Sequence, residues 1–306
     1  MEKVICIVGP TGVGKTALGL TLAKALNSEI ISGDSIQVYR GMDIGSAKIA
    51  RQEMQGIRHH LIDILDPKES YSVKQFQDQA RAICSKLHHE NKIPVVVGGT
   101  GLYIKALLYD YQFDKSSDGQ MADLSVYEDY SNEALYERLK QIDPDALTTI
   151  HVQNRKRIIR ALSIYDTSKV TKSAWIAKQK QELLYDVMLI GLTCERNVLH
   201  ERIGFRVEQM FEQGLEEEIK TLLEQQVNFT DQSMQGIGYK EFAPWHAKEQ
   251  TITEVKEKIK THTRQFAKRQ YTWFRNQMPV NWYDIQNESC IRQILEEVML
   301  WKNPQG

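Results

Sequence analysis

Cysteine is scarce in this chain and long hydrophobic runs are absent, which excludes several classes of protein. The 306 residues include four cysteines, Cys6, Cys84, Cys194 and Cys290, which lie far apart and form no CxxC pair. This spacing indicates neither a zinc site nor a disulfide framework, and it fits the reducing cytoplasm. The apolar runs are strand-sized, far below the roughly 18 residues that span a bilayer, and residues 1–4 lack the pattern of a signal peptide. We therefore expect a cytoplasmic protein with no membrane segment.

An excess of charge of one sign is also absent. Lys and Arg number 39 and Asp and Glu number 40, so the formal net charge is −1. This balance excludes a uniformly basic nucleic-acid coat protein but allows a local basic face. The hydrophobic fraction of 42% and the charged fraction of 26% are those of a folded protein, and the length favours about two domains.

Glycine is unevenly distributed and marks the organisation of the chain. Eleven of the 18 glycines precede Leu102, and only Gly119 lies between Leu102 and Ile190. Glycine-rich turns are typical of an α/β sheet, whereas a long glycine-poor stretch favours a helical insertion. We expect that insertion at residues 113–184, with residues 114–123 as a flexible connection, between core segments 1–112 and 185–306.

Apolar runs and periodic segments predict the individual elements. We expect strands over residues 4–8, 29–32, 60–65, 93–97 and 187–192. We expect helices over residues 16–26, 71–91, 132–141, 155–165, 173–180, 196–213, 215–226 and 253–276. Ser72 and Gln75 are a candidate capping box for the second of these helices. The alternation of strand and helix in the first third predicts a parallel sheet.

A phosphate-loop motif, GxxxxGK[ST], is formed by Gly9, Pro10, Thr11, Gly12, Val13, Gly14, Lys15 and Thr16. It follows an apolar strand and begins a helix, which is the context that supports the motif. Glycines let backbone N–H groups converge on phosphate oxygens, and the helix N-terminus adds partial positive charge. We expect Lys15 to bind the terminal phosphate and the Thr16 hydroxyl to coordinate Mg²⁺. The motif leaves open whether a nucleotide or another diphosphate is bound.

The carboxylate that belongs with this loop is Asp34, just after the second predicted strand. The strand at residues 93–97 ends in Gly98 and Gly99 and supplies no carboxylate of its own. Because ligands of open α/β sheets bind at the carboxyl ends of the strands, Asp34 is expected near the phosphate loop, where it would act on an acceptor. The alternative is that Asp34 only caps the next helix or holds a metal ion.

Two basic segments predict contact with RNA. Lys156, Arg157 and Arg160 share one helix edge. Residues 258–275 contain six basic and no acidic residues, with Lys260, Arg264, Lys268 and Arg275 on one face and Ile259, Phe266 and Trp273 on a face expected in the core. A basic stripe can follow a phosphate backbone. A basic helix alone is more often a solvated face, so this interpretation depends on the phosphate loop beside it.

Six segments of the chain match one family in its order. They are residues 34–48 (DSIQVYRGMDIGSAK), 59–63 (HHLID), 98–103 (GGTGLY), 157–162 (RIIRAL), 236–241 (GIGYKE) and 263–270 (TRQFAKRQ). Together they resemble the tRNA dimethylallyltransferases, also called tRNA isopentenyltransferases. Animal and yeast members often add a C-terminal zinc finger, which this sequence lacks, so the resemblance is to the bacterial type.

The resemblance implies a fold, a reaction and the residues that carry it. The fold is a P-loop NTPase-like parallel sheet core with a mainly helical insertion domain and C-terminal helices. The reaction transfers a dimethylallyl group from dimethylallyl diphosphate to N6 of adenine 37, beside the anticodon of tRNA. Asp34 would be the general base, and Thr16 and Arg206 would bind the departing diphosphate with Mg²⁺. Contacts with the tRNA anticodon stem-loop would come from Asp34, Ser35, Ile36, Gln37, Thr100, Lys156, Arg157, Ile158, Ile159 and Arg160, and the basic stripe adds Arg264 and Lys268. No obligate protein partner is expected, and the chain would act as a monomer.

The sequence also departs from the family at three places. Ser46 and Ile49 stand where the family usually has Thr and Pro. Residues 168–170 replace a usual Gly-Lys-Pro, and no arginine stands at residues 120–124 to help hold tRNA. These changes concern the contacts of the insertion with tRNA and leave the reaction centre intact.

Three other functions remain open from the residues alone. A P-loop small-molecule kinase would place ATP on the loop and use Asp34 to activate a hydroxyl. An isopentenyltransferase that uses free adenine nucleotides would need no surface of tRNA size. A noncatalytic RNA-binding or nucleotide-switch protein would keep its role when Asp34 is replaced by Ala. The two basic segments favour the tRNA enzyme over the first two, and only the Asp34→Ala variant, in which a transferase loses turnover, separates it from the third.

Overall fold

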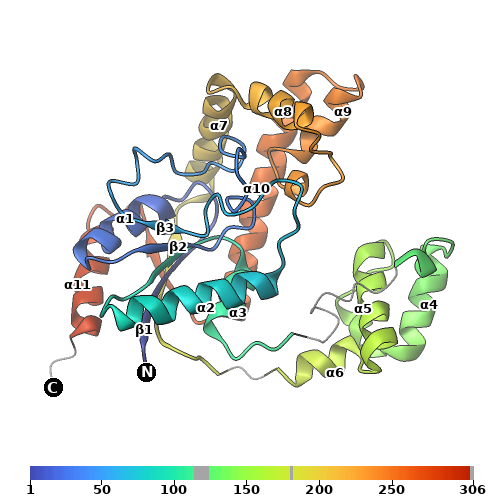
Figure 1. Ribbon diagram of the computed structural model, residues 1–306, viewed down its shortest axis with the longest axis horizontal. Coiled ribbons are helices and arrows are strands. Elements are labelled where there is room, and N and C mark those ends of the chain that lie inside the picture. The colour runs from blue at the N-terminus through green and yellow to red at the C-terminus, as the bar shows by residue number, and fades with distance from the viewer. Residues whose placement is uncertain (114–123, 180–181, 304–306) are drawn as a thin grey trace. The chain divides into compact units, whose positions relative to one another are not determined.

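The computed structural model describes residues 1–113, 124–179 and 182–303, and the chain divides into two compact units (Figure 1). Unit 1 comprises Met1–Leu108 and Leu183–Gly306, and unit 2 comprises Tyr109–Glu182. The insertion inferred from the glycine distribution, residues 113–184, covers most of unit 2. The expected connection at residues 114–123 lies outside the described residues.

Unit 1 is built on a six-stranded sheet in the order β3-β2-β4-β1-β5-β6. The strands are β1 (Lys3–Val8), β2 (Ile30–Ser32), β3 (His59–His60), β4 (Val95–Val97), β5 (Asp186–Thr193) and β6 (Asn281–Asp284). Every pairing between neighbours is parallel. All carboxyl ends therefore meet at one edge of the sheet, where ligands of such sheets bind.

Both faces of the sheet are covered by helices, as expected for a parallel sheet with continuous apolar strands. Ile5 and Ile7 of β1 pack in one buried cluster with residues of α1 (Lys15–Ala25) and α11 (Cys290–Lys302). Cys6, between them, faces the other way, where burial, and next the thiol of Cys84 on α2 (Val73–His89), raise the pKa of Cys6. Because both of its faces are buried, β1 is a firmly held strand, and the phosphate loop begins at its end.

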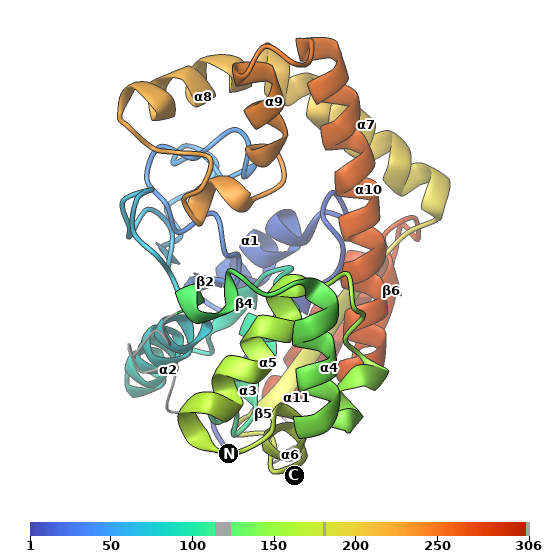
Figure 2. The same ribbon diagram turned by 90° about the vertical axis from the view of Figure 1, so that its right-hand side faces the viewer.

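The remaining helices of unit 1 surround the carboxyl edge of the sheet. They are α3 (Gly101–Leu108), α7 (Arg196–Glu212), α8 (Leu215–Glu224), α9 (Ala243–His246) and α10 (Ile252–Gln277), with 3-10 turns η4 (Ser233–Gln235) and η5 (Lys240–Phe242). Figures 1 and 2 show α7 and α10 side by side, in agreement with their contacts. The predicted capping box of Ser72 and Gln75 is confirmed at the start of α2, and Thr251 with Glu254 forms another at the start of α10.

Unit 2 is helical in its described residues. It holds η2 (Leu124–Tyr127), α4 (Asn132–Ile142), η3 (Pro144–Thr148), α5 (Arg155–Ser168) and α6 (Lys172–Ala177). Leu135, Leu139, Ile158 and Leu162 belong to its own buried cluster. The helices expected here begin and end within a few residues of these bounds, except that residue 180 lies outside the described ranges.

The sequence prediction is wrong at several elements. The strand expected at residues 60–65 is limited to His59–His60, because Leu61 and Asp63 adopt positive φ angles of 61° and 55° and turn the chain. The elements α3, β6 and α11 were not predicted. All four cysteines are buried free thiols. Within the described ranges, no helix combines the length and apolarity needed to cross a bilayer.

Candidate functional site

The phosphate loop connects β1 to α1 and adopts a conformation that requires glycine. Gly9, Gly12 and Gly14 have φ angles of 139°, 84° and 96°. A Cβ at Gly9 would lie 2.6 Å from the carbonyl oxygen of Leu192 on β5. Gly14 is the N-cap of α1, and among the described residues no side chain caps this end. The first N–H groups of α1 are therefore available to an anion.

Lys15 is the first residue of α1 and lies in the interior of the site. Its Nζ donates a hydrogen bond to the carbonyl oxygen of Pro10 at 2.8 Å. Burial, and next the positive charge of Arg206, lower the pKa of Lys15 to about 7, while Asp34 acts in the opposite direction. A buried amine surrounded in this way regains its proton most readily when an anion arrives.

Gln270 of α10 fastens the phosphate loop to a second glycine turn. Its Oε1 accepts from the backbone N–H of Thr11 at 2.9 Å, and its Nε2 donates to the carbonyl oxygen of Gly99 at 3.0 Å. Gln270 is 5% exposed, so water cannot readily replace these bonds. Sequence analysis assigned no role to this residue, although it ends the matching segment at residues 263–270.

Asp34 follows β2 and uses one carboxylate oxygen locally. Its Oδ1 accepts from the backbone N–H groups of Ile36 at 2.8 Å and Gln37 at 3.3 Å. These bonds cap a turn rather than the helix considered from the sequence, because no helix follows Asp34 at residues 35–41. Within the described part of the chain, Oδ2 has no hydrogen-bond partner. The cap fixes the carboxylate, and Oδ2 stays available for another group.

Arg206 of α7 contacts both the phosphate loop and residue 47. Its Nη1 donates to the Thr11 Oγ1 at 3.4 Å, and its Nη2 donates to the Ala47 carbonyl oxygen at 3.5 Å. Burial lowers the pKa of the guanidinium, and Asp34 opposes that shift. Arg202, one turn earlier, is exposed and lines the same cavity. The resemblance assigned the diphosphate to Arg206, and Arg206 is the less exposed of the two arginines.

Two cavities that share residues contain most of the predicted site. The phosphate-loop cavity, about 460 Å³, is lined by residues that include Thr11, Gly12, Gly14, Lys15, Thr16, Asp34, Gln37, Arg202 and Arg206. The neighbouring cavity, about 450 Å³, is lined by residues that include Thr11, Asp34, Ser35, Ile36, Thr100 and Arg206. Asp34 and Arg206 line both. One carboxylate and one guanidinium can therefore contact ligands in both cavities.

Two predicted residues are placed differently from the rest of the site: Val13 of the phosphate loop and Phe266 of α10. Val13 is 1% exposed and packs in the core beside the loop. Phe266, expected in the core, is only half-buried and lines both cavities. This correction arises because α10 turns Thr263, Phe266 and Gln270 toward the cavities.

The basic stripe on α10 faces away from these cavities. Arg264, Lys268 and Arg275 line a separate cavity of about 540 Å³ together with Arg196 and His200 of α7. The pKa of His200 is lowered by burial and then by Arg196 and Arg264, which indicates positive potential there. Lys260, also expected in the stripe, is instead neutralised by Glu208 and Glu257, each at 2.6 Å.

The basic segment of the insertion lies on α5 of unit 2. Lys156, Arg157 and Arg160 are exposed along this helix, and burial followed by the charges of Arg157 and Arg160 lowers the pKa of Lys172. The Ile158 side chain is fully buried in the core of the unit, and Ile159 packs against that core. Residues 120–123, where the family arginine is missing, lie outside the described residues.

The donor set fits a magnesium ion held mainly by a bound ligand. Thr16 and Asp34 line the phosphate-loop cavity and offer oxygen atoms, which Mg²⁺ prefers. The described residues contain no group of three or more His, Cys, Asp or Glu side chains that could form a complete metal site. Mg²⁺ commonly keeps one or two protein ligands and takes the rest from phosphates and water.

Comparison with known proteins identifies the family. The model of the IPP transferase family matches residues 37–277. The tRNA dimethylallyltransferase of Anoxybacillus flavithermus is 48% identical over 97% of this chain and 95% of its own length. The crystal structure of a tRNA delta(2)-isopentenylpyrophosphate transferase from Staphylococcus epidermidis is 41% identical, with a TM-score of 0.74 and complete coverage of both chains. A eukaryotic dimethylallyltransferase, described as acting on tRNA, is 31% identical with a TM-score of 0.86, covering 100% of this chain and 81% of its own. The resemblance inferred from the six sequence segments is thus confirmed: this chain belongs to the IPP transferase family of tRNA dimethylallyltransferases.

Proposed function

We propose that this enzyme transfers a dimethylallyl group from dimethylallyl diphosphate to N6 of adenine 37 in tRNA and releases diphosphate. The observation that carries the proposal is that Asp34 and Arg206 line both the phosphate-loop cavity and the neighbouring cavity. The diphosphate would then lie in the phosphate-loop cavity and the acceptor amine in the neighbouring cavity, and the reacting atoms would meet near Asp34 and Arg206. The family membership and the names of the relatives support the same reaction.

The donor side stabilises the leaving group. As the allylic C–O bond breaks, negative charge builds on the diphosphate oxygen that departs. Lys15, the loop N–H groups and Arg206 are directed at that charge, as electrostatic catalysis requires. Thr16 would hold Mg²⁺ with the diphosphate, and the ion would supply further neutralisation of the leaving oxygens.

The acceptor side activates a weak nucleophile. The exocyclic amine of adenine forms the new N–C bond and must lose a proton. Asp34 Oδ2 is positioned as the general base, while Oδ1 remains in its cap with Ile36 and Gln37. Thr100, Ser35 and Ile36 line the cavity in which the base would lie. Adenine must leave the stack of the anticodon loop to enter it.

Contacts with the anticodon stem-loop are proposed for three groups of residues. Asp34, Ser35, Ile36, Gln37 and Thr100 would contact nucleotides around the reacting base. Lys156, Arg157 and Arg160, with the backbone of Ile158 and Ile159, would contact the stem-loop from unit 2. Arg264 and Lys268 would bind phosphates away from the reaction cavities. We further propose that the chain works as a monomer in the cytoplasm, without an obligate protein partner.

One assay tests the proposed reaction against its rivals. The protein is incubated with Mg²⁺, unmodified bacterial tRNA and labelled dimethylallyl diphosphate, and a parallel tube holds labelled ATP. We expect label in tRNA at adenine 37, located by nuclease digestion, and no turnover of ATP. Phosphorylation of a small acceptor by ATP without label in tRNA would instead establish a kinase. Transfer to free adenine nucleotides but not to tRNA would establish the nucleotide-directed enzyme.

A further inference from the structure

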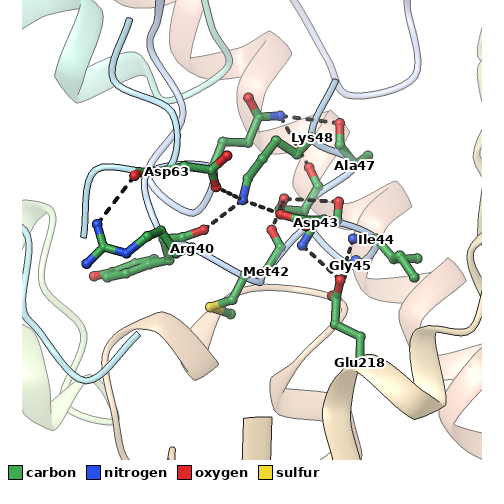
Figure 3. Close-up of polar contacts among 12 residues, drawn as sticks. Arg40, Met42, Asp43, Ile44, Gly45, Ala47, Lys48, Asp63 and Glu218 are labelled. Carbon is green, nitrogen blue, oxygen red and sulfur yellow. Dashed lines mark hydrogen bonds and ion pairs between the residues drawn. The ribbon is translucent and has the colours of Figure 1, made fainter. Parts of the chain in front are cut away.

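A single carboxylate on α8 receives a run of backbone donors from a distant loop. Glu218 Oε2 accepts from the N–H groups of Asp43 at 2.8 Å and Ile44 at 2.7 Å, and Oε1 accepts from Gly45 at 3.1 Å (Figure 3). These three residues lie more than 170 positions from Glu218 in the sequence. Bonds from several N–H groups to one charged acceptor are among the stronger hydrogen bonds in proteins. Glu218 therefore fixes the start of this segment, which we call the 43–47 loop.

Tyr239 extends this network into the loop. Its hydroxyl donates to Glu218 Oε1 at 2.8 Å and accepts from the backbone N–H of Ser46 at 3.0 Å. The ring is fully buried, and a Cβ at Gly45 would lie 2.6 Å from it. Only glycine at position 45 lets the loop approach the ring this closely. The loop is thus held through four consecutive N–H groups.

Lys48, the residue that follows this loop, pairs with the first residue of the loop. Its Nζ lies 2.5 Å from Asp43 Oδ1 and 2.6 Å from Asp63 Oδ1, and its side chain is 3% exposed. It also donates to the carbonyl oxygen of Tyr39 at 2.7 Å. Figure 3 shows Lys48 and Glu218 contacting the loop through different atoms. Neither Glu218 nor Lys48 bonds to the backbone carbonyl oxygens of residues 46 and 47, so these oxygens can accept hydrogen bonds from residues of the site.

Those carbonyl groups orient two residues of the proposed active site. Gln37 Nε2 donates to the carbonyl oxygens of Ser46 at 3.3 Å and Ala47 at 3.4 Å. Arg206 donates to the same Ala47 oxygen at 3.5 Å. Ala47 has a φ of 48°, a left-handed conformation that an alanine keeps only when its neighbours hold it. A shift of the loop would move both side chains.

We propose that Glu218 is a positioning residue for prenyl transfer, acting through the 43–47 loop on Arg206. This inference rests on the proposed function, because it assigns Arg206 to the leaving diphosphate. Glu218 itself lines neither cavity. Its carboxylate sets the position of the Ala47 oxygen, which in turn sets the guanidinium of Arg206 beside Thr11 and Asp34.

The test is a double-mutant cycle with Glu218→Gln and Arg206→Ala. Glutamine keeps the volume of Glu218, but its NH₂ group cannot accept the N–H groups that now meet Oε2 or Oε1. The rate constant of a single turnover is measured with saturating enzyme and donor over tRNA, so that the fraction of folded protein does not enter. We expect Glu218→Gln to slow transfer about tenfold or more in the wild-type background and less than about twofold in the Arg206→Ala background. Equal slowing in both backgrounds would overturn the inference.

Binding of inorganic diphosphate gives a readout that does not need transfer. By calorimetry, Glu218→Gln should weaken diphosphate binding about fivefold when Arg206 is present and leave it unchanged when Arg206 is Ala. Glu217→Gln, at an exposed neighbour on α8, is the matched control and should change neither quantity. If the wild-type enzyme fails to prenylate tRNA, the proposed function fails, while the diphosphate cycle still decides the role of Glu218.

A second variant keeps the test decisive if Glu218→Gln does not fold. Tyr239→Phe removes only the hydroxyl that joins Glu218 to Ser46 and keeps the ring. We expect it to slow single-turnover transfer about threefold, with the effect again lost in the Arg206→Ala background. An unchanged rate in a folded Tyr239→Phe enzyme, or a loss that persists without Arg206, would refute the proposed path.

Discussion

Gln270 on α10 accepts a hydrogen bond from the backbone N–H of Thr11 in the phosphate loop, 259 positions earlier in the chain, at 2.9 Å. The same side chain donates to the Gly99 carbonyl oxygen after β4. The glycine turns after β1 and β4 are therefore tied to the helix that lines both cavities. The geometry of the proposed diphosphate site depends on α10 as much as on the loop itself.

Replacement of Gln270 by Met should weaken donor binding. The variant keeps the side-chain length and leaves the Thr11 N–H and the Gly99 oxygen without partners, at a cost of about 1–3 kcal/mol. We expect the dissociation constant of dimethylallyl diphosphate to rise about tenfold in calorimetry. Gln265→Met, at an exposed position of the same helix, is the control. Unchanged affinity in folded Gln270→Met would show that this bond does not shape the site.

Lys15 should take up a proton when diphosphate binds. Burial and Arg206 lower its pKa to about 7, so at pH 8 the free enzyme carries this amine mostly neutral, whereas the bound anion favours the cation. We expect uptake approaching one proton at pH 8 and much less at pH 6. Titration calorimetry in buffers of different ionisation enthalpy measures it, and subtraction of the Lys15→Met result removes the titration of diphosphate itself. Equal proton uptake by wild type and Lys15→Met would show that Lys15 is not the group that gains the proton.

The same pKa shift fixes how Lys15 affects stability. Its folded pKa of about 7 lies below its usual value of 10.5, so the unfolded chain retains the proton that the folded chain has lost between these pH values. The contribution of Lys15 to the free energy of unfolding therefore rises with pH across this window. Urea unfolding of the ligand-free protein should show a smaller rise for Lys15→Met than for wild type. A larger rise of the free energy of unfolding with pH in Lys15→Met than in wild type would contradict the lowered pKa of Lys15.

Arg264 and Lys268 should contribute to tRNA affinity without contributing to the chemical step. Each contact with a phosphate adds about 0.7–1 to the slope of log affinity against log salt. We expect Arg264→Gln and Lys268→Gln each to reduce that slope by about this amount, with the single-turnover rate constant at saturation unchanged. Arg292→Gln, exposed on α11, is the control. An unchanged slope would leave the α10 cavity without a role in tRNA binding.

The residues proposed to carry the chemistry could be recognised from local sequence. The phosphate loop is contiguous, and Asp34 follows a strand, so the rule that ligands bind at the carboxyl ends of parallel strands brought them together. The long strands and helices were also predictable, because their apolar residues recur at the period of the element. The helix at Val73–His89 is an example, with its capping box and its buried Phe76 and Ala80.

The supporting residues could not be recognised because their partners are far away in the sequence. Glu218 is one of three consecutive glutamates on a helix, and only the fold shows which of them meets the 43–47 loop. Lys260 belongs to the basic stripe by its place in the sequence, but in the fold it pairs with Glu208, 52 positions earlier. The strand β6 buries only one of its four residues at the sheet edge, so its sequence carries no apolar run.

The most direct test of the account is the rate of transfer by Asp34→Asn with both substrates bound. The amide keeps the cap on Ile36 and Gln37 through Oδ1 but cannot accept the adenine proton. We predict that tRNA and donor bind within about threefold of wild type, while the single-turnover rate constant falls by about 10²–10⁴. Transfer by this variant at a rate near that of wild type would remove Asp34 from the mechanism and contradict the account.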